Sequence, residues 1–150
     1  MPTERAVILV SGGVNSAVAA AIAREQYEPA WLHVAWGHRS GERERSAFQA
    51  LAQSLKPSAV EVADLSCMAG FGGNARVSRR LSIEDAEALG RQVPGTFAAG
   101  LLPSMISVAA SWAASLGSRR VILGLNADPQ TGKPPLEQLY PDHRPEFVQA

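Results

Sequence analysis

The chain has 150 residues, 46% of them hydrophobic and 19% charged, a composition typical of one globular domain and not of a disordered chain. Fourteen basic and fourteen acidic residues cancel, so charge gives no reason to expect binding to nucleic acid or to an anionic membrane. The single cysteine, Cys67, excludes an intrachain disulfide and an all-cysteine metal site within one chain. We therefore expect a single domain over residues 1–150.

The expected location is the cytoplasm. A single cysteine fits a reducing compartment. The apolar run that begins at Val7 is short and lacks a cleavage region, which argues against a signal peptide. No apolar stretch is long enough to span a bilayer, so no membrane association is expected.

Strand and helix patterns alternate along the chain. Short apolar or alternating runs predict four strands, at residues 7–10, 29–36, 60–65 and 121–125. Helical spacing and helix-stop signals predict helices at residues 17–23, 42–55 and 105–116, and the start of a last helix at residues 144–148. This order predicts an α/β fold: a parallel sheet with helices on both faces and ligands at the carboxyl ends of its strands.

Residues 66–98 interrupt this alternation. Repeated glycines and a polar middle indicate a long loop, with a candidate short helix at residues 83–89. A loop of this length inside a compact domain is usually functional or mobile. Residues 70–75 match a loose Gly-x-Gly-x-x-Ala pattern, but the basic run that follows is a poor start for the helix that a dinucleotide site needs. A glycine-rich surface loop is therefore favoured over an unrelated dinucleotide enzyme.

The stretch from Ser11 to Ser16, called here the 11–16 loop, joins the first strand to the first helix. Its two glycines permit a tight turn, which aims backbone N–H groups at one point. The helix dipole adds positive potential there, so the turn can hold a phosphate, and the hydroxyls of Ser11 and Ser16 can add donors. The alternative is an ordinary strand-to-helix turn in which Asn15 or Ser16 caps the helix.

The 11–16 loop resembles the Ser-Gly-Gly-x-Asp-Ser signature of the PP-loop ATP pyrophosphatases, which cut ATP between its α and β phosphates. One specified letter differs, because Asn15 stands where that superfamily has Asp. The resemblance implies a Rossmann-like PP-loop ATPase fold and ATP, with Mg²⁺, at the carboxyl edge of the first strand. The implied ATP-binding residues are Val10, Ser11, Gly12, Gly13, Val14, Asn15, Ser16 and Ala17.

Later stretches resemble the 7-cyano-7-deazaguanine synthases of queuosine biosynthesis. Residues 121–127 and 140–147 are similar to a Gly-Val-Asn-like strand end and a Tyr-Pro-Asp-Cys-Arg-Pro-Glu-Phe-like segment of that family. Residues 36–39 are similar to its Asp-Tyr-Gly-Gln-Arg-His turn, and the resemblance runs from Ala6 to the end. It implies an ATP-dependent ligase that adenylates 7-carboxy-7-deazaguanine, releases pyrophosphate, forms an amide with ammonia and dehydrates this to the nitrile. It also implies a possible homodimer.

The same resemblance implies a purine-like substrate near Asp142, Arg144 and Glu146. The residues alone leave open that these side chains cap the last helix instead. The resemblance favours the ligand contact over the cap.

Several positions depart from the family pattern. Asn15 replaces an acidic residue, and Leu101 and Leu102 stand where the family has Arg and Asn, which removes a cation and an amide suited to phosphate. His143 replaces a family Cys, the family's zinc site of four cysteines has no counterpart, and the chain ends before its last helix could complete. We therefore expect weak or absent catalysis; the alternative is a non-catalytic nucleotide-binding or scaffold relative.

Isolated nucleophiles and metal ligands are weak candidates here. Cys67 has no accompanying Cys-His pattern, so a small buried side chain is favoured over a nucleophile. His33, His38 and His143 are scattered without metal-ligand spacing, so structural or exposed roles are favoured and no metal site is expected.

Two further groups have both a ligand-binding and a structural interpretation. Arg76, Arg79 and Arg80 could hold an anion, although a solvated basic loop is favoured. Trp31 and Trp36 could stack on a base, although aromatic residues on a strand more often pack in the core.

Overall fold

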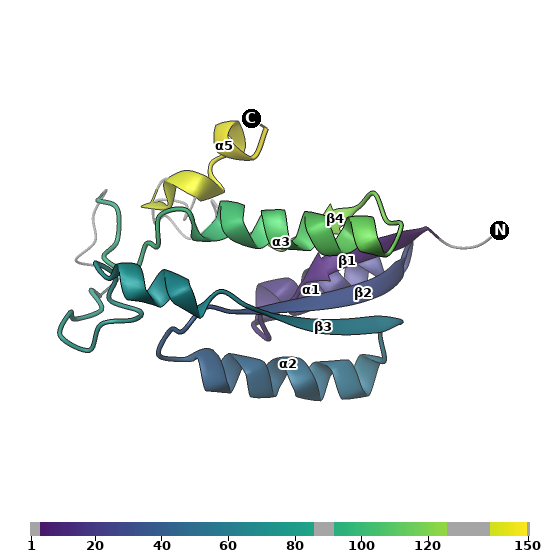
Figure 1. Ribbon diagram of the computed structural model, residues 1–150, viewed down its shortest axis with the longest axis horizontal. Helices are drawn as coiled ribbons and strands as arrows, with labels where there is room; N and C mark the ends of the chain where they lie inside the picture. Colours follow the sequence, from purple (N-terminus) through teal and green to yellow (C-terminus); the bar gives the residue numbers. More distant parts are fainter. Residues whose placement is uncertain (1–3, 86–91, 126–138, 150) are drawn as a thin grey trace.

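The computed structural model describes residues 4–85, 92–125 and 139–149 (Figure 1). Strands and helices alternate through the first half of the chain, and a long loop then leads to a further helix and strand. The elements are β1 (Arg5–Leu9), α1 (Val14–Ala23), β2 (Glu28–Ala35), α2 (Gly41–Leu55), β3 (Ala59–Asp64), the 3₁₀ helix η1 (Ser66–Phe71), α3 (Leu101–Ser115), β4 (Val121–Ile122), the 3₁₀ helix η2 (Pro141–His143) and α5 (Pro145–Gln149).

The four strands form one parallel sheet in the order β3-β2-β1-β4. Val7 in β1 pairs with Ala30 on one side and with Val121 on the other. Because β1 lies inside the sheet and is covered on both faces, its apolar run is continuous and does not alternate. The predicted parallel α/β sheet is confirmed.

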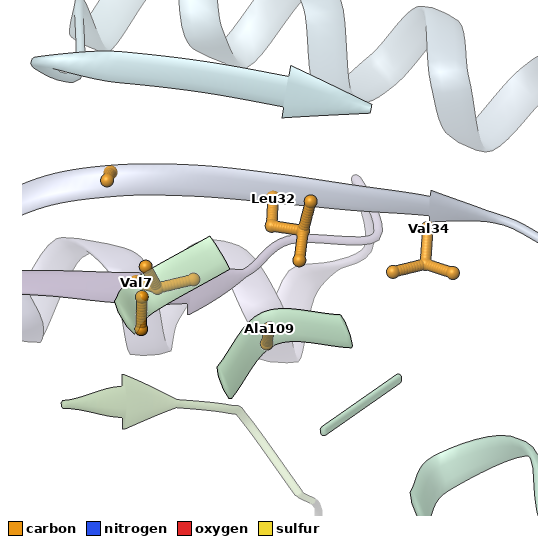
Figure 2. Close-up of a cluster of buried hydrophobic side chains, with 6 residues drawn as sticks. Val7, Leu32, Val34 and Ala109 are labelled. Carbon is orange, nitrogen blue, oxygen red and sulfur yellow. The ribbon is translucent and has the colours of Figure 1, made fainter. Parts of the chain in front are cut away.

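Helices cover both faces of the sheet, as the sequence predicts (Figure 1). On one face Val7, Leu32 and Val34 pack with Ala109 of α3, as Figure 2 shows. On the other face α1 and α2 pack over Ile8 and neighbouring strand residues. Successive strand residues point to opposite faces, so each strand contributes to both cores.

Several predicted boundaries are wrong. α1 begins at Val14 and α3 at Leu101, each a few residues earlier than the apolar spacing predicts. The fourth strand ends at Ile122 and not at residue 125, because its partner β1 ends at Leu9 and the chain then leaves the sheet. Of the candidate helix at residues 83–89, residues 83–85 are not helical and the remainder lies outside the described residues.

Two predictions from the sequence concern the surface segments after β3. Cys67 is exposed on η1, so the expectation of a buried side chain is wrong: the residue follows the end of the strand, where the chain runs over the surface. No helix opens within residues 72–85, which confirms the glycine-rich loop and leaves the dinucleotide motif without its helix. None of the helices in the described part of the chain is long and apolar enough to cross a membrane.

Candidate functional site

The 11–16 loop holds its shape with its own serine hydroxyls. The backbone N–H of Gly13 donates to Ser11 Oγ at 3.2 Å, and the N–H of Ser11 donates to Ser16 Oγ at 3.2 Å. Ser16 Oγ in turn donates to the Gly13 carbonyl at 2.9 Å. These hydroxyls therefore organise the turn, whereas the sequence predicted them only as added donors toward a ligand.

Helix α1 starts directly from this loop without a side-chain cap. Its N-cap residue is Gly13, so neither Asn15 nor Ser16 is the cap. The first helical hydrogen bond runs from the N–H of Ala17 to the Gly13 carbonyl at 3.0 Å. The N–H groups that precede it in the first turn, together with the helix dipole, form the kind of donor set that binds phosphate.

Neighbouring segments hold the loop from two sides. Gly12 has φ +92°, and a Cβ there would lie 2.5 Å from the carbonyl oxygen of Glu44 in α2. On the other side, a Cβ on Gly124 would lie 2.5 Å from the carbonyl oxygen of Asn15. The loop is thus packed between α2 and the segment that follows β4, and only glycine fits at either contact.

A cavity of about 550 Å³ opens beside the loop at the carboxyl edge of the sheet. This volume is in the range of small-molecule sites. The cavity is lined by the loop, by apolar side chains of β1, β2 and α3, by residues 96–98, and by Tyr140, Asp142 and His143. The predicted site residues that line it are Val10, Ser11, Gly13, Val14, Asn15, Ser16, Leu101, Leu102 and Asp142.

Tyr140, Asp142 and His143 form a further part of the cavity lining. The Tyr140 hydroxyl lies 2.7 Å from Thr96 Oγ1 in a hydrogen bond, and its ring stacks on His143 at 5.2 Å. Asp142 is 7% exposed, and burial raises the pKa of its carboxyl. Its Oδ1 accepts no hydrogen bond from the described residues and lies 3.9 Å from Nε2 of His143.

The other two predicted substrate residues lie elsewhere. Arg144 and Glu146 are exposed and do not line the cavity. Gly12 and Ala17, predicted with the loop, also lie outside the cavity lining. The structure thus brings Asp142 to the 11–16 loop and leaves its two charged neighbours at the surface.

A polar cluster at the end of the cavity was not predicted as a unit. It consists of Trp36, His38, Glu44 and Arg76, and three of these, Trp36, Glu44 and Arg76, line the cavity. Nε2 of His38 lies 3.0 Å from Glu44 Oε1, and Nη2 of Arg76 lies 3.5 Å from the same oxygen. The Trp36 ring stacks on His38 at 4.6 Å, and the Arg76 guanidinium lies over that ring at 4.9 Å.

The negative charge of Glu44 is partly compensated by its neighbours in this cluster. Burial alone would raise the pKa of Glu44, but its contacts with His38 and Arg76 outweigh burial and hold that pKa below its ordinary value. Arg76 is only partly solvated, because it lines the cavity with 36% of its side-chain surface exposed, whereas Arg79 and Arg80 are exposed as predicted. Like-charged neighbours in a loop without periodicity gave no signal that one of them turns inward.

The aromatic and histidine residues on β2 have mainly structural roles. Trp31 packs in the core formed with α1 and α2, as predicted. Nδ1 of the buried His33 donates to the Val10 carbonyl at 3.0 Å, at the entrance to the 11–16 loop. Its ring stacks on Phe48 at 5.0 Å, so His33 fixes the loop to the sheet and to α2.

The donor set for metals is sparse. Among residues 4–85, 92–125 and 139–149, no group of three or more His, Cys, Asp or Glu could hold a metal ion. A site of four cysteines does not fit a chain with one cysteine. The loop offers the neutral amide of Asn15 and no carboxylate, so these residues do not form a cage for Mg²⁺ either.

Comparison with known proteins identifies similar sequences. The family described as queuosine biosynthesis protein QueC matches residues 5–150. Proteins named 7-cyano-7-deazaguanine synthase are 32% identical over 152 residues in Koribacter versatilis (99% of this chain, 61% of the relative) and 36% identical over 147 residues in Nitrosospira multiformis (97% and 59%). The protein of that name from Azoarcus sp. is 37% identical over 147 residues (97% and 60%). The chain thus spans about three-fifths of the length of these curated relatives.

Proposed function

We propose that this chain, which belongs to the QueC family of queuosine biosynthesis proteins, binds ATP at the 11–16 loop and 7-carboxy-7-deazaguanine in the adjoining cavity. The observation that carries the proposal is the cavity itself. It joins the phosphate-type loop to the first residues of α3 and to Asp142, three segments that lie far apart in the sequence. The relatives' name, 7-cyano-7-deazaguanine synthase, supplies the reaction class.

The ATP phosphates lie at the start of α1 in this proposal. The uncapped N–H groups of the first turn and the helix dipole provide a fixed set of donors there. Gly13 leaves these donors accessible, because it has no side chain and is exposed. Mg²⁺ bound to ATP would neutralise phosphate charge, and it would be carried by the phosphates since the described residues form no cage for it.

The reaction proceeds by carboxyl activation. The substrate carboxylate attacks the α-phosphorus of ATP, the bond to the β-phosphate oxygen breaks, and pyrophosphate leaves. Ammonia attacks the acyl adenylate, which yields the amide and AMP. The amide oxygen then attacks the α-phosphorus of a second ATP, a second pyrophosphate leaves, and loss of AMP with two protons gives the nitrile. A cavity lined largely by apolar side chains suits this sequence, because it limits the water that would hydrolyse the acyl adenylate.

Asp142 recognises the purine-like ring. A guanine-type edge presents two neighbouring N–H donors, and a carboxylate is the acceptor that pairs with both. Oδ1 of Asp142 has no such donor among the described residues, although it is buried. A buried acceptor without a donor costs free energy, so a ligand that supplies the donors would remove this cost. The rings of Phe97 and Tyr140 line the same part of the cavity.

Calorimetric titration of Asp142→Asn tests this assignment. We expect ATP affinity to stay within a factor of about two, and affinity for 7-carboxy-7-deazaguanine to fall about tenfold or more, because a charge-assisted pair is lost. Glu146→Gln is the matched control, since Glu146 is exposed on the neighbouring helix α5. Equal affinities for the substrate in the wild-type protein and in Asp142→Asn would contradict the role of Asp142.

Binding without turnover is the second candidate function. It is favoured by Leu101 and Leu102, which line the cavity at positions where the family resemblance implies Arg and Asn, and by the amide of Asn15. Loss of one preorganised polar contact costs about 3 kcal/mol, roughly a hundredfold in rate. We therefore expect little pyrophosphate release from ATP, 7-carboxy-7-deazaguanine and ammonia, and more release from the variant Asn15→Asp, Leu101→Arg, Leu102→Asn. Robust release by the unmodified chain would exclude this candidate.

A further inference from the structure

The cavity is short of positive charge for the ligands proposed above. Arg76 is the one Lys or Arg among the described residues that line it, whereas Glu44 and Asp142 add acidic groups. Both ATP and a carboxylate substrate are anions, and burying an anion beside carboxylates is unfavourable without a cation. The position of Arg76 therefore bears directly on ligand binding.

Two kinds of contact hold Arg76 at the end of the cavity. Its backbone N–H donates to Asn74 Oδ1 at 2.7 Å, and its carbonyl accepts from the N–H of Arg39 at 2.8 Å. Its guanidinium lies over the Trp36 ring at 4.9 Å and 3.5 Å from Glu44 Oε1. Its side chain keeps 36% of its surface exposed. The guanidinium has five N–H donors, so one contact with Glu44 leaves donors for a ligand.

Glu44 links this arginine to the 11–16 loop. A Cβ on Gly12 would lie 2.5 Å from the Glu44 carbonyl oxygen, so the backbone of Glu44 packs directly on the loop while its carboxylate contacts Arg76. A single residue, Glu44, therefore connects the guanidinium to the loop that is proposed to hold phosphate. Its planar fork matches the two oxygens of a phosphate or a carboxylate.

We propose that Arg76 binds the oxyanion of the ligand in this cavity, a phosphate of ATP or the carboxylate of the substrate. It supplies the cation that Leu101 and Leu102, which also line the cavity, do not. Glu44 already contacts the guanidinium at 3.5 Å, so a bound oxyanion would either replace this partner or add a second one. This inference rests on the proposed function, because it concerns how the same cavity holds the same ligands.

Separate titrations of Arg76→Met with ATP and with 7-carboxy-7-deazaguanine test the inference. Arg79→Met is the matched control, since Arg79 lies in the same loop, is exposed and carries the same charge. We expect Arg76→Met to weaken binding of one ligand by about tenfold or more, and Arg79→Met to leave both affinities within about twofold. A loss confined to ATP identifies a phosphate contact, and a loss confined to the substrate identifies a carboxylate contact. Unchanged affinity for both ligands would overturn the inference.

A double-mutant cycle with Glu44→Gln separates ligand contact from a structural role of Arg76. Glutamine keeps polar atoms near Ser40 and His38 but removes the competing charge, so we expect the affected ligand to bind severalfold more tightly. That gain should disappear in the Arg76→Met background, because it acts through the guanidinium. If the gain in affinity persists in full in the Arg76→Met background, the inference about Arg76 is overturned, but the proposal that the chain binds ATP still stands. A wild-type chain that binds neither ligand would overturn the proposed function, and this inference with it.

Discussion

His33 shows how one buried side chain can set the position of a ligand-binding loop. Its Nδ1–H donates to the Val10 carbonyl, and its ring stacks on Phe48 of α2. Burial lowers the pKa of His33, and its hydrogen bond to Val10 opposes this only in part. Its Nε2 has no hydrogen-bond partner among the described residues. Protonation would therefore place a charge in a buried position beneath the 11–16 loop, where desolvation outweighs the attraction of Glu44.

The stability of the protein should depend on pH through this residue. The pKa of His33 in the folded state lies below its ordinary value of 6.5, so the unfolded chain binds the proton more tightly. Its contribution is complete above pH 6.5 and is lost as the pH falls below that value, with a slope of up to about 1.4 kcal/mol per pH unit. Urea unfolding between pH 7.5 and pH 5.5 on the wild-type protein and on His33→Asn measures it. A variant profile parallel to that of the wild type would contradict this role.

At the scale of the elements, the β1–α1 junction was predictable because its signal is local. An apolar strand, small residues and an alanine-rich helix follow one another within a short stretch, and each pattern has its own period. Local sequence did not reveal that α2 and residues 123–125 pack against the junction, since those contacts depend on tertiary structure. The alternative in which Asn15 or Ser16 caps the helix is wrong, because Gly13 is the N-cap residue and Ser16 Oγ donates to the Gly13 carbonyl.

The two glycines of the junction should respond differently to substitution. Gly12 has φ +92° and its Cβ would clash with the backbone of α2, so Gly12→Ala should lower the free energy of unfolding by about 2–5 kcal/mol through strain and overpacking. Gly13 has φ −82°, and the nearest atom to its Cβ lies at 3.4 Å. Gly13→Ala should therefore cost less than about 1 kcal/mol. Urea denaturation measures both values, and equal losses would show that the loop is not clamped against α2.

At the scale of the whole molecule, the cavity is built from segments that the sequence could not place together. Periodicity predicts the sheet and the helices, and parallel strands place the loop and the end of β2 at one edge. The inward turn of Arg76 and the contact of Thr96 with Tyr140 arise in loops without a period. Family likeness suggested Asp142, Arg144 and Glu146 together, but burial separates Asp142 from the other two.

The purified chain should contain no stoichiometric zinc. One cysteine cannot make the site of four cysteines that the family resemblance implies, and the described residues hold no alternative cluster of three or more ligands. Elemental analysis after purification without chelator should give a zinc content far below one per chain. One zinc per chain that survives dialysis would contradict this prediction and would require ligands outside the described residues.

The central claim is that the 11–16 loop binds the phosphates of ATP, and ATP-dependent thermal stabilisation tests it most directly. A ligand that binds only the folded state at a hundred times its Kd stabilises that state by about 2.7 kcal/mol, so ATP with Mg²⁺ should raise the Tm of the wild-type protein. Gly13→Val should fold, given the space at that position, but should cover the donors and lose this rise. Val18→Ala, on the exposed surface of α1, should keep it. An undiminished ATP-dependent rise in Gly13→Val would contradict the claim.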